Sequence, residues 1–97
     1  MDAEPYFWAV RVEARLPGVT TLKERRAVVR SVLTRMRQRC NVSASDLDGG
    51  EPAVNRAVLA VSAVSNSAAR AQAEVEMALA LLRADDRLEI FDETGYE

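Results

Sequence analysis

A cluster of basic residues between Thr21 and Arg39 is the part of the sequence with the clearest potential for chemistry. The segment holds seven basic residues and one acidic residue, a net charge of +6, whereas the rest of the chain holds six basic and fourteen acidic residues, a net charge of −8. On a helix with about 100° per residue, four of the cations fall within about 60° of one another. These four, which we call the basic row, are Lys23, Arg26, Arg30 and Arg37. Such a row of cations is suited to binding phosphates.

The start of the same segment also indicates an anion site. Lys23, Arg25 and Arg26 would lie in the first turn of a helix, where the helix dipole disfavours each cation by roughly a few tenths of a kcal/mol. A bound anion would offset that cost, and free backbone N–H groups at the helix start would add to the site. We therefore predict nucleic-acid or anion binding by Lys23, Arg25, Arg26, Arg30 and Arg37. The alternative is a solvated helix face whose charges pair with acids elsewhere in the domain.

The residues that most catalytic and metal sites require are scarce. There is no histidine and one cysteine, Cys40, which excludes His-based acid–base catalysis and leaves an ordinary zinc site short of ligands. Asp46, Asp48 and Glu51 form a small acidic cluster without the spacing of a calcium loop, and we interpret them as a solvated turn. We expect no catalytic residue, no metal site, no cofactor and no enzymatic activity.

Length and composition are those of an ordinary globular protein. The 97 residues, 48% hydrophobic and 29% charged, fit a single domain over 1–97 with its core at about 6–94. No apolar run approaches the roughly 18 residues that cross a bilayer, and the acidic first residues are unlike a signal peptide. A lone cysteine forms no internal disulfide, so we expect a cytoplasmic location.

The helix that carries the basic row is predicted by its cap and its apolar stripe. Thr21 fits an N-cap, with Glu24 reaching back to it as in a capping box. The stripe consists of apolar residues at helical spacing that we expect to be buried: Leu22, Val29, Val32, Leu33, Met36 and Cys40.

Four strands and a second helix complete the pattern. Residues 6–16 alternate in the period of a strand, and residues 54–64 are apolar on both sides, which indicates a central strand. A short polar strand is predicted over 41–48, a helix from about 67 to 84, and a last strand over 87–94. The inward face of the second helix is expected to hold Ala71, Val75, Ala78, Leu79 and Leu82.

This order of elements predicts an α+β fold, the ferredoxin-like β-α-β-β-α-β sandwich, with two helices on one face of a four-stranded antiparallel sheet. The first and third strands should be central. The other face of the sheet should be open and present Arg11, Glu13 and Arg15. We interpret the acidic residues at 85–86 and 92–93 as solvated ends of the last helix and strand.

Four short motifs occur together in this framework: Leu-Pro-Gly at 16–18, Thr-Leu-Lys-Glu-Arg-Arg at 21–26, Asn-Val-Ser at 41–43 and Val-Ser-Asn at 64–66. Over about Phe7 to Ile90 the chain resembles the bacterial YlxP-like family (domain of unknown function 503). The resemblance implies a ferredoxin-like fold. Because members of that family are often encoded beside translation initiation and ribosome-maturation factors, it also implies a role near the ribosome.

We therefore expect a non-enzymatic RNA- or ribosome-associated module whose partner is ribosomal RNA or a ribosomal subunit, without a membrane or a small-molecule cofactor. The central strands lack the aromatic pairs with which RNA recognition motifs stack bases, so charge and shape should govern binding. One alternative is a homodimerising or protein-interaction domain, for which Met77 and Leu81 would suit a contact. A third hypothesis is an enzyme that acts on a phosphorylated small molecule at the start of the first helix.

Overall fold

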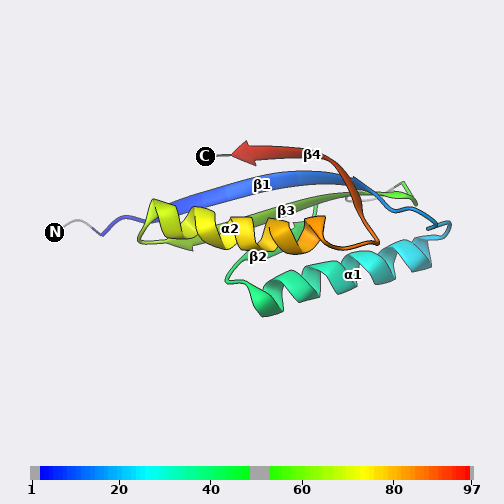
Figure 1. The fold of residues 1–97 in the computed structure, drawn as a ribbon, viewed down its shortest axis with the longest axis horizontal. Helices are drawn as coiled ribbons and strands as arrows, with labels where there is room; N and C mark the ends of the chain where they lie inside the picture. The colour runs from blue at the N-terminus through cyan, green and yellow to red at the C-terminus, as the bar shows by residue number, and fades with distance from the viewer. Residues whose placement is uncertain (1–2, 49–52, 97) are drawn as a thin grey trace.

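The computed structural model describes residues 3–48 and 53–96 of the chain. Its elements are β1 (Tyr6–Arg15), α1 (Leu22–Arg39), β2 (Ser43–Asp46), β3 (Arg56–Ser65), α2 (Ala68–Arg83) and β4 (Glu89–Tyr96). The four strands form one antiparallel sheet in the order β2-β3-β1-β4, and both helices lie on one face of it (Figure 1). The predicted ferredoxin-like sandwich is confirmed, with β1 and β3 in its centre.

The core fills the space between the sheet and the two helices. Alternation along β1 and β3 turns one set of side chains inward, so that Val12, Leu59 and Val61 are almost completely buried, as is Leu16 directly after β1. Each large aliphatic side chain that is fully buried in this way contributes about 1.5–3 kcal/mol relative to an exposed one. All five residues predicted on the inward face of α2 are buried, and Trp8 packs against the core while remaining half-buried.

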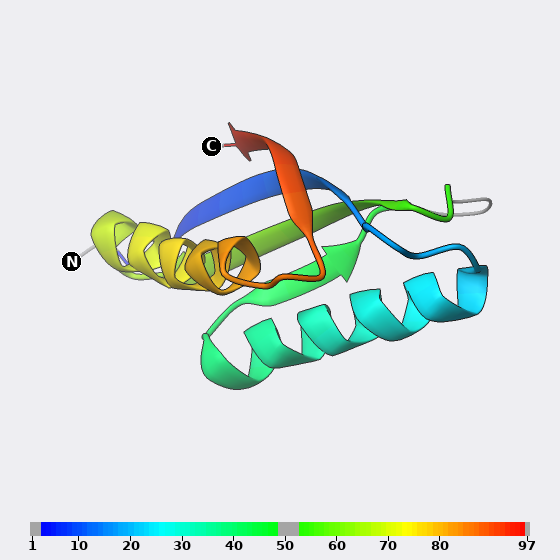
Figure 2. The same ribbon diagram turned by 45° about the vertical axis from the view of Figure 1, so that its right-hand side comes forward.

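The two helices cover different parts of the sheet. α2 packs against the central strands β1 and β3, whereas α1 packs mainly against the edge strand β2 (Figure 2). Neither helix, in the part of the chain that the structure describes, is long and apolar enough to cross a membrane. The position of α1 over an edge strand leaves a large part of its surface facing solvent.

The predicted cap at the start of α1 is present. The hydroxyl oxygen of Thr21 accepts a hydrogen bond of 3.1 Å from the backbone N–H of Glu24. The Glu24 carboxylate in turn accepts hydrogen bonds from the hydroxyl groups of Thr21 and Thr20, at 2.9 and 3.1 Å. These hydroxyl donors lower the pKa of Glu24. The cap therefore satisfies the backbone N–H of Glu24, a helix donor that would otherwise lack a partner.

The buried stripe of α1 matches the prediction except at its beginning. Val29, Val32, Leu33, Met36 and Cys40 are buried as predicted. Leu22, which was also predicted to be buried, is 47% exposed. It is the first residue of the helix, and on its side of the helix burial begins one turn later, at Arg25. A position at the end of an element can share the core-facing side without reaching the core.

Candidate nucleic-acid interface

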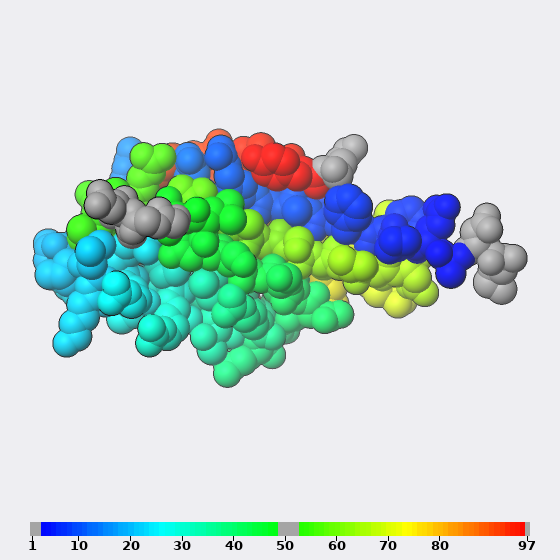
Figure 3. Space-filling model, turned by 180° about the vertical axis from the view of Figure 1, so that it is seen from behind, coloured from blue at the N-terminus to red at the C-terminus, as the bar shows by residue number. Residues whose placement is uncertain are grey.

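The basic row lies along the exposed surface of α1. All four of its residues are exposed, as predicted, while the neighbouring Val29 and Leu33 are buried beneath the helix. Lys23 and Arg37 are about 21 Å apart along the helix axis at 1.5 Å per residue. Seen from behind, α1 (cyan to teal) extends beyond the edge of the sheet formed by β2, so a large partner can approach this surface (Figure 3).

A shallow groove of about 370 Å³ runs between α1 and the β2 end of the sheet. Arg26, Arg30 and Arg37 line it from the helix, and Asp46 and Asp48 line it from the end of β2. The groove is therefore basic along the helix and acidic at one end. A phosphate chain that enters it is drawn to the helix side and repelled from the acidic end.

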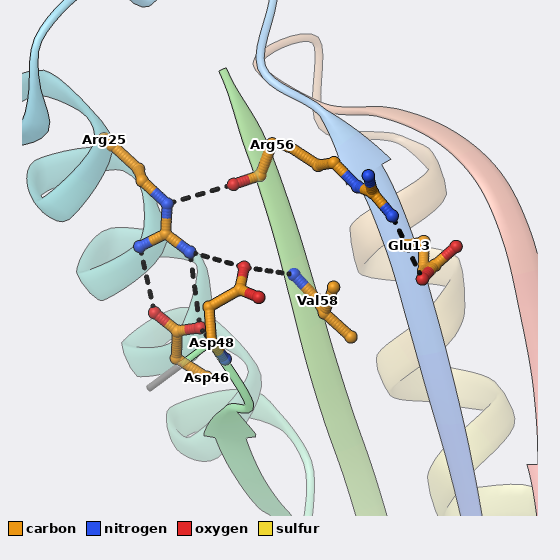
Figure 4. A network of polar contacts seen from close by, with 6 residues as sticks. All are labelled: Glu13, Arg25, Asp46, Asp48, Arg56 and Val58. Atoms are coloured by element: carbon orange, nitrogen blue, oxygen red, sulfur yellow. Dashed lines mark hydrogen bonds and ion pairs between the residues drawn. The ribbon is translucent and has the colours of Figure 1, made fainter. Parts of the chain in front are cut away.

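Arg25, predicted as part of the anion site, points away from the basic row and is 5% exposed. Its guanidinium group donates from Nη1 to Asp46 Oδ2 at 3.1 Å and from Nη2 to Asp48 Oδ2 at 2.9 Å. Its Nε donates to the backbone carbonyl of Arg56 at 3.0 Å (Figure 4). A buried guanidinium group requires such partners, so Arg25 serves the fold and we leave it out of the proposed surface.

The same network corrects the interpretation of Asp46 and Asp48 as a solvated turn. Asp48 Oδ2 also accepts from the backbone N–H of Val58 at 3.1 Å, and Asp46 Oδ1 accepts from the N–H of Asp48 at 3.0 Å. The two aspartates thus hold the end of β2 against β3 and α1. Glu51, the third predicted member of the acidic cluster, lies outside the described residues.

One signal in the sequence could have revealed the role of Arg25. On a helical wheel it lies about 40° from Val29, inside the apolar stripe, whereas the four members of the basic row lie outside it. A lone arginine at a stripe position predicts a buried ion pair, because a charged side chain is rarely buried without a partner. The acids that it meets are Asp46, the last residue of the next strand, and Asp48, two positions later.

Arg37 combines an exposed position with a structural contact. Its Nη2 donates a hydrogen bond to the backbone carbonyl oxygen of Ala44 in the edge strand β2. Edge strands present backbone groups that another strand could pair with, and a side-chain donor at such a carbonyl discourages this pairing. Arg37 therefore also ties α1 to β2.

Within residues 3–48 and 53–96, the remaining members of the basic row form no ion pair. Among the described residues, the ion pairs of the protein join Arg25 and four arginines outside α1 to carboxylates, and none includes a member of the basic row. The alternative hypothesis was that acids elsewhere in the domain pair with this helix. Among the described residues, such pairs form with Arg25 and not with the basic row.

Two acids that were interpreted as solvated ends are instead paired. Asp85 is 8% exposed and accepts from Arg87 Nη2 at 2.7 Å, and Glu93 accepts from Arg83 Nε at 2.9 Å. The hydrogen bonds from Arg87 lower the pKa of Asp85, and those from Arg83 lower the pKa of Glu93. Arg83 consequently ties the end of α2 to the middle of β4, and Arg87 orders the connection between these two elements.

Other surfaces bear on the protein-interaction alternative. Met77 is 54% exposed, whereas Leu81, proposed for the same contact, packs partly against the core. On the open face of the sheet, Phe7 and Val64 are register partners in β1 and β3, and they are 59% and 66% exposed. Exposed apolar side chains are more concentrated here than around Met77.

The described residues offer little for other chemistry. No group of three or more His, Cys, Asp or Glu side chains within 3–48 and 53–96 is placed to hold a metal ion. Cys40 is buried, and burial raises the pKa of its thiol, so the thiol stays protonated at neutral pH. Cys40 is therefore a small apolar residue of the core, as its stripe position predicts.

Comparison with curated proteins finds no match to this chain. A comparison with family models matches residues 7–94 to a family described as "Protein of unknown function (DUF503)". The match runs from the second residue of β1 to Thr94 in β4, so it includes α1 and both aspartates that hold Arg25. The chain belongs to this family of unknown function, DUF503.

Proposed function

We propose that this protein is a non-enzymatic RNA-binding module of the cytoplasm that associates with ribosomal RNA or a ribosomal subunit. The observation that supports the proposal is the basic row: four exposed cations aligned on one face of α1 in a chain whose formal net charge is −2. Concentrating cations on one surface of an otherwise acidic domain directs a polyanion to that surface.

The chemistry of the row suits phosphates in particular. Three of its four members are arginines, whose planar guanidinium groups bind phosphate oxygens through paired hydrogen bonds. Each neutralised phosphate releases condensed counterions, which provides affinity without regard to base sequence. Contacts of this kind position the protein on an RNA and do not select a sequence.

A ribosomal partner accords with the density of phosphates on folded ribosomal RNA and with the role that the sequence resemblance implies. A cytoplasmic location accords with a single buried thiol and no disulfide.

The test is sedimentation of cell lysate through a sucrose gradient at low and at high salt. The wild-type protein should travel with ribosomal particles at low salt and remain at the top of the gradient at high salt. The variant Arg26→Gln/Arg30→Gln should remain at the top in both conditions. Lys23 is kept in this variant. Arg37 is kept because it also bonds to the edge strand at Ala44.

The matched control is Arg15→Gln/Arg70→Gln, which removes two exposed charges outside α1. Arg83 and Arg87 are unsuitable controls, because they hold the largely buried carboxylates of Glu93 and Asp85. Arg15 meets Glu89 at 3.4 Å between two exposed side chains, and such a pair contributes little to stability. The control should sediment like the wild-type protein. Equal behaviour of the two variants would show that α1 is not the contact surface. A protein contact through the open sheet face would then become the leading hypothesis, tested by the dependence of molecular mass on concentration.

A further inference from the structure

The outward surface of α1 carries a strip of small, uncharged residues beside the basic row. At about 100° per residue the strip spans about 60° of the helix, and its members are all exposed: Ala27, Ser31, Thr34 and Gln38. These residues line a broad, shallow depression together with Arg30 on one side and Arg35 on the other. Three of the four carry a hydroxyl or amide group; the Ser31 hydroxyl accepts a hydrogen bond of 2.9 Å from Arg87 Nη1, and Thr34 and Gln38 can exchange hydrogen bonds with a ligand.

Cations border this neutral strip on both sides. The basic row borders one side, and Arg35 and Arg39, both exposed, border the other. Glu24 is the single acid of α1, and its carboxylate is held by hydroxyl groups at the helix start. The resulting surface is a flat hydrogen-bonding strip between two lines of positive charge.

Aromatic rings lie elsewhere on the molecule. Among the described residues, the exposed aromatic side chains are Tyr6, Phe7, Phe91 and Tyr96, which belong to β1 and β4. β4 is the sheet edge opposite to β2, against which α1 packs. Binding of unpaired RNA relies on stacking of bases on such rings. Among the described residues, α1 therefore offers no exposed ring on which an unpaired base could stack.

We infer that the outward face of α1 binds double-helical RNA across its minor groove. This inference rests on the proposed function and specifies the kind of RNA. The minor groove of an A-form helix is wide and shallow and displays 2′-hydroxyl groups. The small side chain of Ala27 permits close approach, Thr34 and Gln38 supply partners for the 2′-hydroxyl groups, and Arg87, which donates to the Ser31 hydroxyl at 2.9 Å, adds a further cation beside the strip. The two lines of cations reach the phosphates on either side of the groove.

The test measures affinity for three ligands: an RNA duplex, a DNA duplex of the same sequence, and one unpaired RNA strand of the same length. The RNA duplex should bind about tenfold more tightly than either of the others, the ratio expected from one or two additional hydrogen bonds. Thr34→Ala/Gln38→Ala should bring the RNA and DNA duplex affinities close together without altering the salt dependence. Alanine is the best helix former, and circular dichroism checks that the fold is kept.

Two further variants sharpen the result. Arg35→Gln/Arg39→Gln should weaken binding of the RNA duplex about as much as Arg26→Gln/Arg30→Gln, because cations on both sides of the strip contact phosphates. Gln72→Ala, at an exposed position of α2, should change nothing.

The possible failures are distinguishable. Equal or tighter binding of the unpaired strand, still sensitive to Arg26→Gln/Arg30→Gln, overturns the duplex inference and leaves the proposed function standing. Equal binding of RNA and DNA duplexes overturns recognition of the 2′-hydroxyl groups. Absence of binding to all three ligands overturns both the inference and the proposed function.

Discussion

The guanidinium group of Arg25 and the carboxylate of Asp46 lie 3.1 Å apart and join the buried side of α1 to the last residue of β2. The Arg25 side chain is 6% exposed, whereas those of Asp46 and Asp48 are each 26% exposed. The cation is thus almost fully desolvated, and the anions keep part of their hydration. Because the cation has lost nearly all of its water, Arg25 depends on the two carboxylates more than they depend on it.

Replacement of Arg25 by alanine is expected to lower the free energy of unfolding by about 3 kcal/mol, the low end of the range for a broken buried pair, because both carboxylates retain some water. Arg25→Lys should recover little of the loss, since an ammonium group lacks the fork that spans two carboxylates and a carbonyl. Urea denaturation measures both. A midpoint near that of the wild-type protein for Arg25→Ala would show that the network contributes little to stability.

Leu33→Ala is expected to cost about 2–5 kcal/mol, the range for a truncated core leucine. Leu22→Ala provides the matched comparison, because Leu22 shares the predicted stripe but is 47% exposed. Its cost should be below about 1 kcal/mol, as for other partly exposed positions. Equal shifts of the urea midpoint in the two variants would contradict the packing of α1 described above.

Stability is expected to fall in acid because of Asp85 and Glu93, whose pKa values are lowered in the folded protein by Arg87 and Arg83. At acidic pH the unfolded chain then binds more protons than the folded one, so the free energy of unfolding rises as pH rises from acid. The contribution is complete above the unfolded pKa of about 4 and is lost as pH falls through the lower folded values. Urea midpoints at pH 6 and pH 3 should differ less for Asp85→Asn than for the wild-type protein. An unchanged difference would show that the Asp85 pair does not govern the acid sensitivity.

The affinity for RNA should fall with salt, and Arg26→Gln/Arg30→Gln should make that fall less steep. Each lost phosphate contact removes about 0.7–0.9 from the slope of log affinity against log salt concentration. Fluorescence anisotropy with a labelled RNA between low and moderate salt provides the slopes. The control Arg15→Gln/Arg70→Gln should keep the wild-type slope. Parallel lines for all three proteins would place the phosphate contacts away from α1.

Much of the architecture could be predicted because it is encoded in neighbouring residues. The alternation of Val10, Val12 and Ala14 defines the inner face of β1, and the spacing of Val75 and Leu79 defines that of α2. The exposure of the basic row follows from the same helical geometry, since its residues lie beside the stripe formed by Val29, Leu33 and Met36. Periodicity and capping depend on residues within a few positions of one another, so the chain itself determined the elements, their order and the charged face of α1.

Only the tertiary structure decided which charged residues serve the fold and which remain on the surface. Arg25 follows the same local pattern of basic residues as Arg26, yet it is buried against Asp46, 21 positions away in the chain. Leu22 is an apolar residue on the core-facing side of α1. It stays exposed because it is the first residue of the helix, and burial on that side begins one turn later. Arg37 meets the carbonyl of Ala44 only because α1 lies over the edge strand. Such contacts depend on where one element ends relative to another, and burial of a charge is tolerated only where a partner from elsewhere in the chain arrives beside it.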